Sequence, residues 1–163
     1  MTRRDFITLI GGAAAWPIAA RAQPRERMRR IGVLLPAAAD DLEFQARLAV
    51  FHQALALLGW NIGRNLRIET RWTTANVAEI RRNAAELAAL APDIILTHGA
   101  SGVASLLQAT RTVPIVFAVV ADPVGAGFVN SLARPGGNAT GFTVYDYAIG
   151  GNGWSCSSRS RPA

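Results

Sequence analysis

Short apolar runs alternate with helix-like patterns through the middle of the chain, and this alternation constrains the fold more than any other feature. Three runs are continuously apolar: Ile31–Leu35, Ile94–Leu96 and Ile115–Val120. Such runs are typical of strands that are buried on both faces of a parallel sheet. Because helical patterns separate them, the sequence predicts βαβ units and an α/β fold.

Two further strands are predicted. Apolar and polar side chains alternate strictly over residues 66–72, which is typical of a strand at a sheet edge or on a thinly covered part of the sheet. The other strand lies around residues 140–144, after the turn at Gly136-Gly137. With the alternating strand at the edge and second in the chain, the prediction is a doubly wound parallel sheet of order 2-1-3-4-5.

Three helices are predicted between these strands. The first is capped by Asp40 or Asp41, ends at Gly59, and carries one apolar stripe made of Phe44, Leu48, Phe51, Leu55 and Leu58. The second begins at Asn76, with Glu79 three residues later as in a capping box, and stops before Pro92. The third is short and runs through residues 103–107.

In a sheet of this order, ligands bind beyond the carboxyl ends of the strands where the strand order reverses. This rule selects the loops at residues 36–41, 98–102 and 121–125. The glycines of the 98–102 loop allow a close backbone approach, and the next helix offers free N–H groups to a carboxylate or phosphate. Ser101 adds a hydroxyl, although a plain turn with Ser101 as the helix cap is the alternative. The spacing fits neither a Walker loop nor a dinucleotide fingerprint.

Two other side chains in these loops have chemical potential. Asp122 places a carboxylate at the end of the most apolar strand, where it either receives a ligand ammonium or hydroxyl, or caps a helix that begins at Pro123. His98 is interpreted as a hydrogen-bonded residue at a strand end, since no candidate nucleophile accompanies it in the sequence. The only other histidine, His52, falls in a helical pattern. No spacing suits a metal site, so we expect no catalytic residue, no metal and no cofactor.

The N-terminal segment reads as an export signal. Arg3 and Arg4 precede an apolar run from Phe6 to Ala20, which is too short for a bilayer span and is followed by a small-x-small cleavage pattern before Gln23. The pattern resembles a twin-arginine (Tat) signal. We expect residues 1–22 to be removed and the mature chain to reside in a bacterial periplasm, without stable membrane insertion. A retained membrane anchor is the alternative.

The net charge of +6 is carried by arginine alone, because the sequence contains no lysine. Residues 23–150 hold 12 arginines and 10 acidic residues, so much of the excess lies at the two ends of the chain. A nucleic-acid-binding domain normally concentrates its basic residues in a stripe with aromatic partners. We therefore expect no nucleic-acid partner.

Several longer motifs resemble one known family. They are residues 59–66, residues 109–118, the Asp122-Pro123-Val124-Gly125 turn and residues 131–142. The sequence is similar to periplasmic solute-binding proteins of ABC importers, in the group that includes tryptophan- and tyrosine-binding members. The resemblance covers about residues 26–152 and identifies residues 23–150 as the first of two αβ lobes of a type I periplasmic-binding-protein fold.

The resemblance implies a function without catalysis. A small solute, such as an amino acid, would be clamped between two lobes joined by a hinge and passed to ABC permease subunits. The contacts implied for this lobe are Ala37, Asp40, Gly99, Ala100, Ser101, Gly102, Asp122 and, near the hinge, Thr140. These residues fall largely in the loops selected from topology. The identity of the solute does not follow from the sequence.

The family pattern stops near residue 151. Residues 153–162 lack helical periodicity, but one added base before codon 153 allows a frame that encodes Trp-Val-Glu-Leu-Leu-Ile-Glu-Ile-Ala-Pro, an apolar-faced helix. We expect that a one-base deletion shifted the frame and that residues 151–163 form a disordered tail, in which the single cysteine, Cys156, falls. A chain of one lobe would bind its ligand weakly or not at all.

Two alternatives of a different class remain. A ligand-sensing regulatory lobe of the same architecture would need a linked signalling domain. A small flavodoxin-like enzyme would need a phosphate loop or an acid/base pair.

Overall fold

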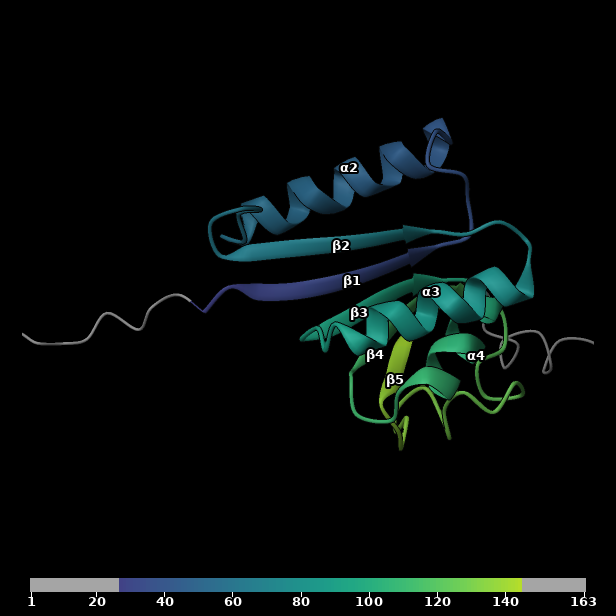
Figure 1. Cartoon of the computed structure of the whole chain (residues 1–163). Helices are drawn as coiled ribbons and strands as arrows, with labels where there is room; N and C mark the ends of the chain where they lie inside the picture. Colours follow the sequence, from purple (N-terminus) through teal and green to yellow (C-terminus); the bar gives the residue numbers. More distant parts are fainter. Residues whose placement is uncertain (1–26, 145–163) are drawn as a thin grey trace, which may run out of the picture.

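A five-stranded parallel sheet organises the chain in a computed structural model that describes residues 27–144 (Figure 1). The strand order is β2-β1-β3-β4-β5, which confirms the predicted order. The strands are β1 (Arg29–Leu35), β2 (Leu66–Trp72), β3 (Ile94–His98), β4 (Ile115–Val120) and β5 (Ala139–Thr143). The alternating strand β2 lies at the edge, as its one polar face predicts.

The sheet separates helices on its two faces. The helices are α2 (Leu42–Leu57), α3 (Val77–Ala89) and α4 (Ala100–Ala109). Helices α3 and α4 pack with the sheet in one buried cluster that includes Leu34, Ile95 and Phe117. Side chains alternate between faces along a strand, so Val33 and Leu96, which face α2, lie on the other side.

Helix α2 is held much less firmly than the other two. None of its residues is buried, whereas α3 buries Ile80, Asn83, Ala84 and Leu87. The predicted stripe faces the sheet, since its members Phe44, Leu48, Phe51 and Leu55 are half-buried. It is wrong at its last member: Leu58 is the helix C-cap and is 75% exposed.

Side chains cap the first two helices. The Asp41 carboxylate accepts hydrogen bonds from the N–H groups of Glu43 and Phe44, so Asp41 and not Asp40 is the cap. Asn76 caps α3 as predicted. Its partner Glu79 departs from a capping box, because its carboxylate accepts from the backbone and hydroxyl of Thr74 instead of the backbone of Asn76.

Two glycines are required by close packing. A Cβ at Gly102 would lie 2.2 Å from Thr97 Oγ1, and a Cβ at Gly141 would lie 2.0 Å from the Phe117 carbonyl oxygen. Any side chain at these positions forces its neighbours apart. The first contact seats the start of α4 on β3, and the second seats β5 on β4.

Two predicted segments lie outside the described residues: the export signal at residues 1–22 and the tail at residues 151–163. Within residues 27–144, no helix is long and apolar enough to cross a membrane.

Candidate functional site

The three loops selected from topology lie at one edge of the sheet. They follow β1, β3 and β4, which are neighbours and run in the same direction, so their carboxyl ends share an edge. A backbone hydrogen bond of 3.0 Å from the Gly99 N–H to the Ala118 carbonyl oxygen joins the second loop to β4. The sheet therefore brings residues 36–41, 98–102 and 121–125 to one side of the molecule.

The N-terminus of α4 is an uncapped polar feature of this edge. Its cap is Gly99, at φ +79°, and no side chain accepts from the first turn. Ser101 is an exposed residue inside that turn, so its predicted capping role is wrong. In contrast, the other two described helices are closed by Asp41 and Asn76. Unsatisfied N–H groups and the helix dipole make such an end attractive to an anion.

Packing fixes this end of α4. The Thr97 hydroxyl donates to the Leu34 carbonyl oxygen at 3.2 Å, and Gly102 lies against that hydroxyl. Thr97 and Gly102 are both buried. The first turn of α4, with Ala100 and Ser101 exposed, is thus held over the ends of β1 and β3.

Asp122 lies at the end of β4 and organises a turn. Its Oδ1 accepts a 2.7 Å hydrogen bond from the Gly125 N–H. Residues 123–127 form turns and not the predicted helix. Asp122 therefore caps a backbone N–H group as predicted, but that of a turn and not of a helix. Asp122 is exposed, and its carboxylate has further lone pairs for a ligand donor.

The remaining predicted contacts divide into two groups. Ala37 is half-buried and Asp40 is exposed in the loop after β1, at the same edge as the α4 N-terminus. Thr140 lies elsewhere: it is exposed and pairs with Val116 near the start of β4, away from the carboxyl ends of the strands. The structure therefore brings together every predicted contact except Thr140.

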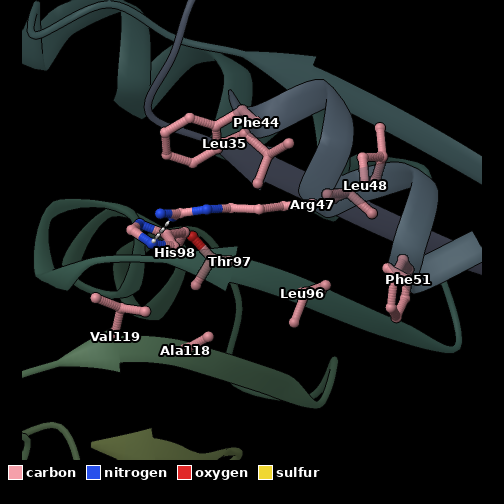
Figure 2. Close-up of a pocket in the computed structure, with 11 residues that line it drawn as sticks. Leu35, Phe44, Arg47, Leu48, Phe51, Leu96, Thr97, His98, Ala118 and Val119 are labelled. Carbon is pink, nitrogen blue, oxygen red and sulfur yellow. Dashed lines mark hydrogen bonds between the residues drawn. The ribbon is translucent and has the colours of Figure 1, made fainter. Parts of the chain in front are cut away.

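His98 forms a cluster with two side chains of α2 (Figure 2). Its Nε2 lies 3.3 Å from Arg47 Nη1, and the Phe44 ring meets the imidazole edge-on at 5.1 Å. Arg47 also lies over the Phe44 ring, 5.0 Å from its centroid. Arg47 is not among the residues predicted from the sequence. The signal for it is its position three residues after Phe44, on the face of α2 that meets the sheet.

Burial lowers the pKa of His98 below its usual value. The positive charge of Arg47 acts in the same direction, while Glu43 opposes it. The imidazole is therefore neutral at pH 7. No group of three potential metal ligands occurs within residues 27–144.

Comparisons with known proteins agree on one family. Residues 31–148 match the profile described as ABC transporter substrate binding protein. A tyrosine-binding protein of Clostridioides difficile is 30% identical over 95 residues, which cover 58% of this chain and 28% of that protein.

Solved structures give the same result. A ligand-free, open substrate binding protein with adhesive properties from Clostridium difficile has a TM-score of 0.63 at 26% identity, over 69% of this chain and 38% of that one. An ABC domain from Streptococcus pneumonia in complex with L-Trp has a TM-score of 0.62 at 25% identity, over 71% of this chain and 38% of that one. A conserved domain protein from Vibrio cholerae has a TM-score of 0.66 at 28% identity, over 72% of this chain and 39% of that one. The chain thus spans less than two fifths of each relative.

Proposed function

Because the chain belongs to the ABC transporter substrate-binding proteins, we propose that it forms one lobe of a clamp that delivers a small solute to an ABC importer. In such a clamp the ligand sits between two lobes and is buried when a hinge closes. The described residues form one αβ unit with one loop-lined edge, which is the part that a first lobe contributes.

The observation that carries this proposal is the open N-terminus of α4. It lies at the carboxyl edge of the sheet, between the loops after β1 and β4, and no side chain makes a capping hydrogen bond to its first turn. A ligand carboxylate there accepts hydrogen bonds from free backbone N–H groups and meets the positive end of the helix dipole.

An amino acid suits the rest of the edge. Asp122 presents an exposed carboxylate on the loop of the neighbouring strand, where a ligand ammonium is complementary in charge. The names of two relatives, a tyrosine-binding protein and a domain in complex with L-Trp, support an aromatic amino acid. Tryptophan and tyrosine are therefore the first ligands to test.

One lobe provides about half of the contacts of a clamp and no closure. We expect this chain to bind its amino acid with a dissociation constant on the order of millimolar. Calorimetry with L-Trp and L-Tyr measures this directly. A submicromolar dissociation constant for the chain alone would contradict the proposal that it provides only one lobe of the clamp.

A charge reversal at the open helix end tests the site itself. Ser101→Glu places a carboxylate in the first turn of α4, where it competes with the ligand carboxylate while stabilising the helix. The control is Ser101→Gln, which has nearly the same shape without the charge. We expect S101E to weaken L-Trp binding about tenfold relative to S101Q. Equal affinity of the two variants would exclude this helix end as the carboxylate site.

Export and the altered reading frame complete the proposal. If residues 1–22 are a Tat signal, N-terminal sequencing of the chain recovered from a periplasmic fraction begins at Gln23. If a base was lost near codon 153, the gene downstream encodes family sequence in another frame. An uncleaved N-terminus would contradict the export signal, and unrelated downstream sequence would contradict the altered reading frame.

A further inference from the structure

A cavity lies between α2 and the face of the sheet opposite α3 and α4, and one end of it reaches the carboxyl edge at His98 and Val119 (Figure 2). Its volume is about 500 Å³, within the range of small-molecule sites. Side chains of α2, β1, β3 and β4 line it, and most are apolar, among them Val33, Leu48, Phe51 and Leu96. Its walls therefore suit an apolar body.

Two polar side chains at one end of this cavity define what else it accepts. Arg47 reaches from α2 toward His98 at the end of β3, as Figure 2 shows. A guanidinium only donates hydrogen bonds, so His98 Nε2 is the acceptor and the proton of the neutral ring resides on Nδ1. That Nδ1 is buried and has no hydrogen-bond partner among the described residues.

A buried N–H group without an acceptor costs free energy. The cavity thus combines one cation and one unsatisfied donor with apolar walls. An oxygen anion supplies both the missing acceptor and the counter-charge, once the imidazole turns about its Cβ–Cγ bond to present Nδ1. We propose that this cavity binds a monocarboxylate with an apolar body, on the α2 side of the carboxyl edge and separate from the N-terminus of α4, which does not line it.

Glu43 is the carboxylate that pairs with Arg47 in the described structure. It pairs with Arg47 one helical turn away, and both side chains are largely exposed, at 70% and 51%. An exposed pair of this kind contributes little to stability. A ligand carboxylate therefore displaces Glu43 from Arg47 at small cost, and removal of the Glu43 charge favours the ligand.

The cavity wall also holds the most strained backbone position among the described residues. Val119 has φ +60°, which a β-branched residue rarely adopts, at an irregularity in the pairing of β4 with β5. Strain of this kind is retained where the surrounding structure demands it and often occurs at ligand sites. Val119 lines the same end of the cavity as His98 (Figure 2).

Titration of the chain with 4-phenylbutyrate and with 4-phenylbutanol tests the proposal. The two probes share an apolar body and differ in the carboxylate. Methyl NMR signals of Leu48 and Val119 report on the cavity. We expect the acid to shift them and to bind at least about fivefold more tightly than the alcohol. Equal binding of both probes, or no shift at millimolar acid, would overturn the site.

Two substitutions with opposite expected effects sharpen the test. Arg47→Gln weakens acid binding about tenfold, whereas Glu43→Gln strengthens it about twofold. Arg81→Gln, an exposed position on α3, controls for the loss of a positive charge and leaves binding unchanged. Weaker binding in E43Q would contradict the proposal, even if R47Q proved unstable. Ser101→Glu must leave this site intact, so failure here is distinguishable from failure of the edge site.

Discussion

Single atoms decide whether a glycine in this fold is replaceable. A Cβ at Gly141 meets the Phe117 carbonyl oxygen at 2.0 Å, whereas a Cβ at Gly137 has nothing within 4 Å. We expect Gly141→Ala to lower the free energy of unfolding by about 2 kcal/mol, because β5 must move away from β4. Gly137→Ala is the matched control and should change stability by less than about 0.5 kcal/mol. Urea unfolding of both variants measures the difference, and equal stability would contradict the close approach.

Asp93 ties the start of β1 to the start of β3. Its carboxylate accepts from the Arg30 backbone N–H at 2.8 Å and from Arg29 Nη1 at 2.7 Å. The backbone hydrogen bond, and then the one from Arg29, lower the pKa of Asp93 below 3.8. Stability from this carboxylate is therefore present above the unfolded pKa and is lost as the pH falls through the folded pKa.

The pH dependence of unfolding tests this assignment. Asp93→Asn should destabilise the chain by about 1 kcal/mol at pH 7. The variant should also lose less stability than the unsubstituted chain between pH 5 and pH 3, because it lacks the titrating group. If the free energies of unfolding of the two proteins fall in parallel across this interval, Asp93 is not the group whose titration lowers stability.

Residue-scale choices were the hardest to predict from sequence. The loop before α2 offers two adjacent carboxylates, and only the backbone geometry selects Asp41 over Asp40 as the cap. Likewise Ser101 resembles a cap by residue type, but the N-cap of α4 lies two residues earlier, at Gly99, which has a positive φ. A shift of one or two residues in a helix start is not encoded in composition.

Elements differ in how firmly the sheet holds them. Leu87 of α3 is fully buried, whereas Leu57 of α2 is 83% exposed. We expect Leu87→Ala to cost about 3 kcal/mol of unfolding free energy. Leu57→Ala is the matched change in the other helix and should cost less than about 0.5 kcal/mol. Chemical unfolding compares the two, and a similar cost for both would contradict the looser packing of α2.

Periodicity predicted that each helix exists and which of its faces meets the sheet, but not how deeply the side chains on that face are buried. The stripe of α2 faces the sheet as its spacing requires, yet none of its residues becomes buried. Depth depends on what fills the space beneath the helix, and a cavity of about 500 Å³ lies there. This property belongs to the assembled layers and not to any local pattern.

At the scale of the whole molecule, general rules of parallel sheets were sufficient. One alternating strand placed at the edge fixed the order β2-β1-β3-β4-β5, and that order brought three loops to one edge. Thr140 falls outside this rule, because its placement near a hinge came from resemblance alone and stays a prediction. The register of β5 on β4 puts it beside Val116, near the start of β4.

We propose that the open N-terminus of α4 receives the ligand carboxylate. Titration of the ¹⁵N-labelled chain with L-Trp, read residue by residue in NMR spectra, measures whether it does. We expect the amide signals of Ala100, Ser101 and Gly102 to move at millimolar L-Trp, together with those of the non-proline residues in the 36–41 and 121–125 loops, while the signal of Thr140 stays in place. Saturable shifts that leave the first turn of α4 unmoved would contradict it.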